Sequence, residues 1–417
     1  MSQPRAVVVV TGSELVRGDR NDLNGPFLAR ELGARGIEPA RILVVGDRAE
    51  ELEAALREGL RADLCIVSGG LGPTHDDRTV ELLARAADRD LAVDAELERE
   101  IEEVTRTIAE RLGRPYADFA TGVRKQASLP RGAVSLGLAG TAPGIVLERD
   151  GAVAVALPGP PAELRRLWAK AVESEPVRRV LERARPPERR VLRFFGASES
   201  SVARALAEAG GEAQGVEATV CAREFEIHVD LFGPAEGLAA ALRERLARYL
   251  FAEDERSIAE IVLELCRGDG LSLATAESCT GGLVAARLTA VPGASDVFLG
   301  AVVAYDDAVK EAELGVPGEV LERHGAVSAE TAAAMAAGAR ARLGADLAVS
   351  VTGIAGPGGG TPEKPVGLVY LHAAGPDGSL GAEFSVPGGR DTVRARAAVS
   401  ALHLVRRLLT RSRDSSA

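Results

Sequence analysis

Residues 63–88 read DLCIVSGGLGPTHDDRTVELLARAAD and combine a continuous apolar run, a glycine-rich turn and a helix-periodic segment. The apolar run is typical of a strand buried on both faces, and the last segment is typical of a helix. The same alternation surrounds this stretch, with apolar runs at 6–10 and 41–46 and helical patterns at 23–36 and 51–60. Strands that alternate with helices predict a mostly parallel sheet with helices on both faces. We therefore expect a three-layer α/β/α domain over residues 1–172.

Two further domains are expected after residue 172. Residues 173–252 contain adjacent strand patterns flanked by helical patterns, which predicts a small α+β module. Residues 256–413 return to alternating strands and helices and predict a second α/β/α domain. Its strands are expected at 271–275, 297–305, 347–353, 367–374 and 382–386.

Composition limits the class of protein. The chain has 417 residues and a formal net charge of −11, which disfavours direct binding of nucleic acid. No apolar run reaches the length of a membrane helix, so no membrane contact is expected. The four cysteines are scattered, which favours reduced thiols and a cytoplasmic location. The strands and amphipathic helix of the middle module predict a homodimer.

The glycine-rich turn after the strand in 63–88 is a candidate phosphate site. Backbone N–H groups of glycines can approach phosphate oxygens closely, and a helix start adds partial positive charge. The adjacent acids Asp76 and Asp77 could hold a divalent cation against those phosphates. The alternative is a plain turn in which Asp76 caps the helix. The residues that we expect to bind phosphate are Ser68, Gly69, Gly70, Gly72 and Thr74.

A second candidate centre lies in ATAESCTGGLVAARL at 274–288. Ser278 stands between a strand and an apparent helix start, where free backbone N–H groups could stabilise an oxyanion. Lys310, one of only four lysines, follows the strand expected at 297–305. If that strand pairs with 271–275, a neutral Lys310 could serve as base for the Ser278 nucleophile. Three alternatives are a Cys279 thiolate, His324 as base, and a phosphate-binding turn without covalent chemistry.

These motifs together resemble one known family. GSEL, SGGLGPTHDDRT, RKQ, GTAPG and LPGPPAE resemble the molybdopterin-binding-like domain of the CinA family (competence/damage-inducible protein). AESCTGG, VVAYDDAVKEAELGV, HGAVS, SVTGIAGPGGG and EKPVGLVY resemble its C-terminal domain, which is similar to nicotinamide-nucleotide amidohydrolase. The sequence departs from the family pattern at Ser13, where Thr or Asp is usual, and at 136–139, where an Asn-Pro pair is usual.

The resemblance implies a bifunctional nucleotide-recycling hydrolase. The C-terminal domain would convert nicotinamide mononucleotide to nicotinate mononucleotide and ammonia through a Ser-Lys dyad, without a cofactor. The N-terminal domain would cleave the pyrophosphate of ADP-ribose with a divalent metal (magnesium, manganese or cobalt). Two other functions stay open: a non-catalytic nucleotide- or pterin-binding protein in competence or DNA-damage response, and a molybdopterin-handling first domain.

The resemblance also carries over individual residues. Asp77 and Asp47 would lie near the phosphates and the metal, with Asp76 beside them. Ser278 and Lys310 would be the nucleophile and the base, with Tyr305 polarising the dyad and Thr352 contacting the oxyanion or amide. The residues that would bind substrate are Thr280, Gly281, Gly282, Gly353, Gly356 and Arg390, the last as a phosphate clamp.

Overall fold

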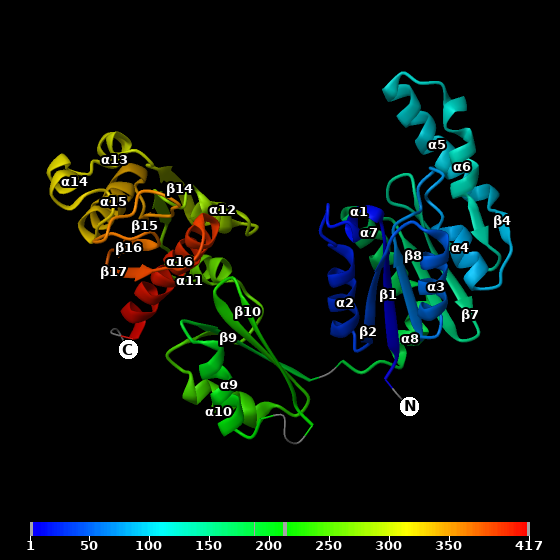
Figure 1. Cartoon of the computed structure of the whole chain (residues 1–417), viewed down its shortest axis with the longest axis horizontal. Helices are drawn as coiled ribbons and strands as arrows, with labels where there is room; N and C mark the ends of the chain where they lie inside the picture. The colour runs from blue at the N-terminus through cyan, green and yellow to red at the C-terminus, as the bar shows by residue number, and fades with distance from the viewer. Residues whose placement is uncertain (1–2, 187, 212–214, 415–417) are drawn as a thin grey trace. The chain divides into compact units, whose positions relative to one another are not determined.

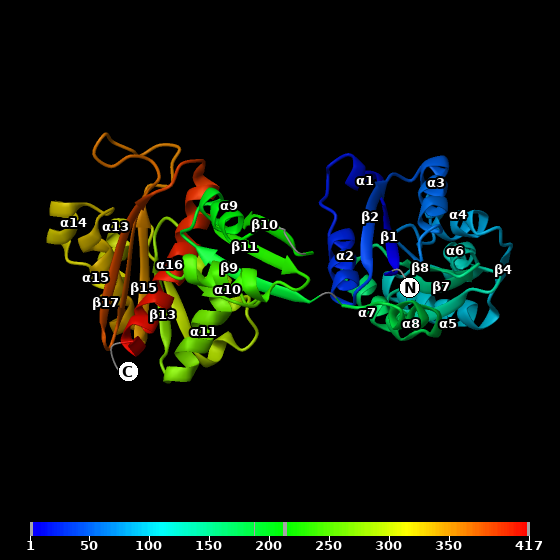
Figure 2. The ribbon, with the colours of Figure 1, turned by 90° about the horizontal axis from the view of Figure 1, so that it is seen from below.

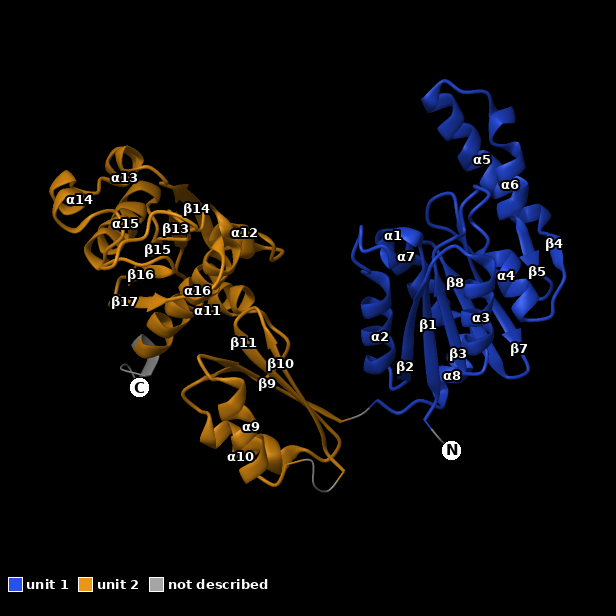
Figure 3. Ribbon diagram, viewed as in Figure 1, with its two compact units in different colours: residues 1–187 blue, residues 188–417 orange. Residues whose placement is uncertain are grey.

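The computed structural model describes residues 3–186, 188–211 and 215–414. The chain forms two compact units, residues 1–187 and 188–417 (Figure 3). Within the described ranges, no helix is both long enough and apolar enough to cross a membrane.

The first unit is built on a six-stranded sheet in the order β2-β1-β3-β8-β7-β6 (Figure 1). Strands β2, β1, β3 and β8 are parallel, and β7 and β6 continue the sheet antiparallel. The strands are β1 Arg5–Thr11, β2 Glu38–Val45, β3 Leu64–Ser68, β6 Val134–Leu138, β7 Pro143–Arg149 and β8 Ala152–Leu157. The prediction of a mostly parallel sheet is confirmed.

Helices cover both faces of this sheet because its central strands are apolar on both sides. In β1, Val7 and Val9 pack into one core, whereas Val8 and Val10 pack into the other. Alternate side chains of a strand point to opposite faces, so the valine run supplies both cores at once. One core is covered by α3 (Ala49–Gly59) and α4 (Thr79–Ala86), and the other by α2 (Asn24–Ala34), α7 (Pro161–Glu173) and α8 (Glu175–Glu182) (Figure 2).

A helical arm separates α4 from β6. It comprises β4 Leu91–Val93, α5 Ala95–Leu112, η1 Tyr116–Asp118, α6 Ala120–Gln126 and β5 Ser128–Pro130. The Asp94 carboxylate caps the start of α5, and Gly113, with a φ of 63°, ends it. Figure 1 shows α5 and α6 projecting from the six-stranded sheet.

The first unit extends further than the expected boundary at 172. Helix α8 lies beyond that boundary, yet Val177 and Val180 are buried in the same core as Trp168 of α7. Residues 173–186 therefore belong with the first unit, because their apolar side chains are buried against it.

The middle module forms a four-stranded antiparallel sheet in the order β10-β11-β9-β12. Its strands are β9 Arg189–Phe195, β10 Glu217–Arg223, β11 Glu226–Phe232 and β12 Leu250–Ala252. Helices α9 (Glu199–Glu208) and α10 (Glu236–Arg245) supply the apolar cover for this sheet. The expected α+β module is present and lies in the same compact unit as the residues that follow it.

The C-terminal domain holds a five-stranded sheet in the order β14-β13-β15-β16-β17. Its strands are β13 Leu273–Glu277, β14 Phe298–Val303, β15 Leu347–Gly353, β16 Leu368–Gly375 and β17 Gly378–Ser385. Helices α11 (Ile258–Asp269), α12 (Leu283–Thr289) and α16 (Arg390–Asp414) pack into one core. Helices α13 (Asp307–Leu314) and α15 (Ala329–Leu343) pack into the other, and α14 (Gly318–His324) follows α13. The domain is a second three-layer α/β/α structure.

In each of the two α/β sheets, the order in which the chain adds strands reverses at one strand. The chain leaves β1 for β2 on one side and then returns to β3 on the other, and it leaves β13 for β14 and returns to β15. Ligands of such sheets bind beyond the carboxyl ends of the strands at this switch point. The candidate residues near Ser68 and Ser278 follow β3 and β13, so both groups lie at such edges.

Candidate active site

The segment 278–282, here called the nucleophile loop, follows the fully buried strand β13. Ser278 is buried to 8% exposure at its start. Gly281 and Gly282 have φ values of 60° and 96°, a region in which residues with a Cβ are disfavoured. The two glycines are therefore needed to turn the chain from β13 into α12.

Glu277 occupies the helix start whose N–H groups were expected to be free. Its carboxylate is fully buried and accepts hydrogen bonds from the backbone N–H groups of Gly282, Val284 and Ala285 at 2.9, 3.1 and 2.9 Å. The expectation of free N–H groups is thus wrong for these three residues. A buried carboxylate at a helix N-terminus is stabilised by these donors and by the helix dipole.

Arg394 of α16 determines the orientation of the loop peptides. Its guanidinium donates to the carbonyl oxygens of Cys279 at 3.2 Å and Thr280 at 3.0 Å. A trans peptide directs its C=O and the next N–H to opposite sides, so the N–H of Thr280 points away from Arg394. Within the described ranges this N–H donates to no other residue. It is therefore a candidate donor to an oxyanion.

Arg394 was not among the residues expected at this site. It stands four residues after Arg390 near the start of the closing helix. Residues four apart share one face of a helix. That spacing was the one available signal that both guanidinium groups would reach the same region.

Lys310 lies at the same edge of the sheet as Ser278. β13 and β14 are parallel neighbours, and the N–H of Ala304 donates to the carbonyl of Glu277 at 2.8 Å. The expected pairing of these two strands is confirmed. The Lys310 amine, with the residue 1% exposed, donates to the Tyr305 carbonyl at 3.3 Å and to Asp307 at 2.9 Å. The amine is thus bonded to these two oxygens and not to the Ser278 hydroxyl.

Cys279 is a poor alternative nucleophile. The side chain packs in the core beneath α12 and α16 and is 4% exposed. Burial raises the pKa of the Cys279 thiol to about 12, against the reactive thiolate form.

Arg390, Tyr305 and Gly356 are brought together from three separate segments. The Arg390 guanidinium donates to the Tyr305 hydroxyl at 2.6 Å and to the Gly356 carbonyl at 2.7 Å. Tyr305 is 59% exposed, so the cluster faces solvent. A guanidinium and a phenol at an exposed sheet edge suit recognition of an anionic group.

Of three other expected substrate contacts, two are engaged within the fold and one is buried without a hydrogen-bond partner among the described residues. The Thr352 hydroxyl is fully buried and donates to the Ala326 carbonyl at 2.7 Å. A Cβ on Gly353 would lie 2.7 Å from the Leu368 carbonyl, so strand packing alone requires glycine there. The Thr280 hydroxyl is fully buried and lacks a hydrogen-bond partner among the described residues.

The glycine-rich segment 353–365 is anchored near its end by a hydrogen bond from a lysine side chain. The Lys364 amine donates to the His324 carbonyl at 2.6 Å. The His324 ring lies 3.4 Å from the Glu330 carboxylate, at the end of α14. Both side chains hold local structure.

In the first unit, the turn after β3 has the expected backbone form. Gly69 and Gly70 have φ values of 105° and 64°. The Ser68 hydroxyl is buried, accepts from Asn24 at 3.0 Å and donates to the Pro158 carbonyl at 3.3 Å. Ser68 therefore links this turn to Asn24 and Pro158. The Gly69 N–H donates to the Leu157 carbonyl at 3.0 Å, so the expectation that it binds phosphate is wrong. The N–H groups of Gly70 and Gly72 have no acceptor within the described ranges and are the candidate phosphate donors.

Thr74 joins the two adjacent acids of this turn. Its hydroxyl contacts the Asp76 carboxylate at 2.6 Å and also the Asp77 carboxylate, and its N–H donates to Asp77 at 3.0 Å. The hydrogen bond from Thr74 lowers the pKa of Asp76. A Cβ on Gly72 would lie 2.4 Å from Asp77, so this arrangement requires glycine at 72. Lys125 of the RKQ motif donates to the Thr74 carbonyl.

Asp47 belongs to a separate hydrogen-bonded group. Its carboxylate accepts from the Ser13 hydroxyl at 2.6 Å and from the Ser13 N–H at 3.0 Å. Serine at 13 thus keeps a hydroxyl on Asp47 despite the departure from the family pattern. The second departure, at 136–139, lies at the end of β6, where Lys170 donates to the Leu136 carbonyl at 3.0 Å.

The adjacent carboxylates of Asp76 and Asp77 are the candidate ligands for the expected metal. No group of three or more His, Cys, Asp or Glu side chains is arranged to hold a metal ion in the described part of the chain. Mg²⁺ commonly uses one or two carboxylates and takes further ligands from water and substrate phosphates. The paired carboxylates of Asp76 and Asp77 fit that smaller requirement.

Two surface cavities lie away from these residues. One of about 520 Å³ is lined by residues of α9 and the segment after α10, including Arg204 and Arg248. The other, of about 470 Å³, lies beside α8. Neither is lined by a residue of the expected sites, so the sites are assigned from side-chain chemistry and strand ends.

Comparisons with known proteins match both halves of the chain. Residues 7–178 match the model of a probable molybdopterin binding domain, and residues 255–409 match that of the CinA C-terminal domain. A CinA-like protein of Mycolicibacterium vanbaalenii is 44% identical over 419 residues, covering 97% of this chain and 99% of that protein. A CinA-like protein of Mycobacterium tuberculosis is 43% identical over 427 residues, covering 97% of each.

Among solved structures, the competence/damage inducible protein CihA of Agrobacterium tumefaciens is 42% identical, with a TM-score of 0.35. The match covers 38% of this chain and 99% of that protein. The near-full-length similarity to CinA-like proteins shows that the chain belongs to the CinA family.

Proposed function

We propose that the C-terminal domain hydrolyses the carboxamide of nicotinamide mononucleotide, giving nicotinate mononucleotide and ammonia. One observation carries this proposal: Ser278 begins a loop whose Thr280 N–H is oriented by Arg394 and has no acceptor within the described ranges. A hydroxyl followed by an oriented N–H donor is the arrangement that acyl transfer requires.

The chemistry proceeds through an acyl-serine. The Ser278 hydroxyl oxygen adds to the carboxamide carbon, and its proton passes to the neutral amine of Lys310. Collapse of the tetrahedral adduct breaks the C–N bond, and the lysine returns the proton to the departing ammonia. Water then hydrolyses the ester, which releases the carboxylate and regenerates the serine.

The Lys310 amine donates to the Asp307 carboxylate at 2.9 Å. Asp307 is therefore a second, acidic residue beside the proposed dyad, and it holds the amine in a defined position.

Recognition of the nucleotide phosphate is assigned to the Arg390 cluster. Arg390 is held by Tyr305 and the Gly356 carbonyl and keeps further N–H donors for an anion. Gly281 and Gly282 leave space beside the reacting amide because neither carries a side chain.

For the first unit, we propose hydrolysis of the pyrophosphate of ADP-ribose or a similar nucleotide. Gly70 and Gly72 would contact phosphate through backbone N–H groups, whereas the Gly69 N–H already donates to the Leu157 carbonyl. Asp76 and Asp77 would hold a divalent cation, which when bound neutralises charge on the phosphates. Asp47 would support this edge of the sheet through Ser13.

Ammonia release from nicotinamide mononucleotide tests the first activity. Ser278→Ala and Lys310→Ala should each reduce kcat by at least about a hundredfold, because each removes a group that takes part in bond making or proton transfer. Cys279→Ala is the matched control and should keep most of the activity. Full activity in the Ser278→Ala protein would remove the proposed dyad. Ligand-induced thermal shift without turnover would instead favour the non-catalytic binding protein.

ADP-ribose hydrolysis tests the second activity, with product formation followed with and without a chelator. A molybdopterin-handling first domain would give no such products. We also propose a homodimer and a cytoplasmic location. Light scattering of the full chain and fractionation of cells that produce it would test these two points.

A further inference from the structure

The tip of the β10–β11 hairpin contacts both helices that flank the nucleophile loop. Glu224 accepts a hydrogen bond at 2.6 Å from Arg287 of α12. The Phe225 ring lies under the guanidinium of Arg396 of α16, 5.2 Å from its centroid. These contacts join the middle module to the C-terminal domain at the helix that begins where the nucleophile loop ends.

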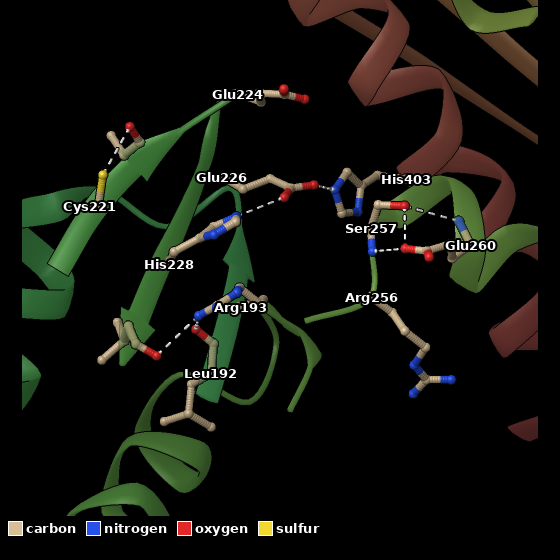
Figure 4. A network of polar contacts seen from close by, with 12 residues as sticks. Leu192, Arg193, Cys221, Glu224, Glu226, His228, Arg256, Ser257, Glu260 and His403 are labelled. Carbon is tan, nitrogen blue, oxygen red and sulfur yellow. Dashed lines mark hydrogen bonds and ion pairs between the residues drawn. The ribbon is translucent and has the colours of Figure 1, made fainter. Parts of the chain in front are cut away.

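The next residue of the tip is anchored more deeply. Glu226 is 7% exposed and is hydrogen-bonded to the fully buried His403 of α16 at 2.7 Å and to His228 at 3.2 Å (Figure 4). The His403 ring stacks on Phe195 of β9, with ring centroids 3.7 Å apart. Polar and aromatic contacts thus hold the end of the hairpin next to its turn against α16, so the tip has a defined position.

The backbone of the tip is unusual for the residues it carries. Glu224 and Phe225 have φ values of 51° and 69°. A two-residue hairpin turn with both residues in the left-handed region favours Asn-Gly, and residues with larger side chains are strained there. The two strained residues are the same two that contact Arg287 and Arg396.

The contacts lead directly to the proposed reaction centre. α12 begins at Leu283, immediately after the nucleophile loop, and Arg396 stands two residues after Arg394. Arg394 holds the loop carbonyls that orient the Thr280 N–H. We propose that Glu224 and Phe225 are positioning residues, through which the middle module holds α12 and α16 so that the nucleophile loop keeps its reactive shape. For the reaction affected, the inference rests on the proposed amide hydrolysis.

The test is a double substitution, Glu224→Asn with Phe225→Gly, in the full chain. It removes both side-chain contacts yet supplies the residues that this turn prefers, so Tm should stay within about 2 °C of the unsubstituted protein. We expect kcat for ammonia release to fall about three- to tenfold with KM changed less than about twofold, because the loop acts in the transition state. Hydrogen exchange of the amides at 279–289 should become faster.

Single variants separate this inference from a general loss of ion pairs. Glu224→Ala and Arg287→Ala should each lower kcat. The protein that carries both of these alanine substitutions should have a kcat no lower than that of the more affected single variant, because the two residues act through one contact. The matched control is Glu208→Ala, which removes the exposed ion pair with Arg245 elsewhere in the middle module and should leave kcat unchanged.

The outcomes distinguish this inference from the proposed function. Unchanged kcat and unchanged exchange at 279–289 in the double substitution would overturn the positioning role. A large fall in Tm with kcat and KM both impaired would also overturn it, because the tip would then only stabilise the fold. If the unsubstituted protein releases no ammonia, the proposed function fails. Exchange at 279–289 then decides the positioning role alone: faster exchange supports it and unchanged exchange overturns it.

Discussion

Replacing Arg394 by methionine should uncouple catalysis from stability. The substitution keeps an unbranched apolar side chain but removes the two hydrogen bonds to the carbonyls of Cys279 and Thr280. The loop peptide can then rotate, and the Thr280 N–H loses its fixed direction. The proposed phosphate contact of Arg390 does not involve this peptide, so we expect KM to change little.

The magnitude follows from the two lost bonds. A hydrogen bond from a charged donor contributes about 1.5–3 kcal/mol. The Arg394 side chain is 28% exposed, so screening by solvent favours the lower end of that range. Two such bonds at about 1.5 kcal/mol each amount to about 3 kcal/mol of transition-state stabilisation, and their loss lowers kcat by up to about 150-fold.

Steady-state ammonia release, with Tm measured on the same samples, checks this expectation. Arg407→Met is the matched control, because Arg407 lies on the exposed side of α16. Arg394→Lys should be intermediate, since one ammonium cannot reproduce the planar fork that reaches two carbonyls. If Arg394→Met keeps its kcat, the peptide-orientation argument is refuted.

Three further predictions follow from other contacts. Asp307→Asn removes the carboxylate that holds the Lys310 amine at 2.9 Å, so kcat for ammonia release should fall more than KM changes, and an unchanged kcat would show that this ion pair does not position the base. Burial lowers the pKa of His403 to about 4, whereas a histidine of the unfolded chain has a pKa of about 6.5. Below about pH 6.5 the unfolded chain therefore binds a proton that the folded chain does not. The free energy of unfolding should fall by about 2 kcal/mol between pH 7 and pH 5, as measured in urea titrations. His403→Gln keeps a donor to Glu226 without titrating and should flatten that dependence; an equally steep dependence would assign it to other groups. Asp77→Asn should abolish metal-dependent cleavage of ADP-ribose while ammonia release persists, and equal loss of both activities would contradict separate sites.

Sequence by itself determined the layered architecture and the places where chemistry could occur. The valines of β1 alternate between two cores, so their order along the chain already implies cover on both faces. Gly281 and Gly282 follow an apolar strand because the turn there needs left-handed backbone. The alternation of a strand and the position of a left-handed turn depend on residues close together in the sequence, so the sequence alone predicts them.

Only the tertiary structure decided how the side chains are used. Arg394 reaches Cys279 across 115 positions of the chain, and Glu226 reaches His403 across 177. The Glu277 carboxylate accepts from helix N–H groups that were expected to be free. The Thr352 hydroxyl donates to the Ala326 carbonyl, and the Lys310 amine donates to the Asp307 carboxylate. Residues 173–186 belong to the first unit because Val177 and Val180 are buried in its core. Each of these outcomes depends on which distant group arrives within hydrogen-bond or packing distance, and that is set by the folded chain as a whole.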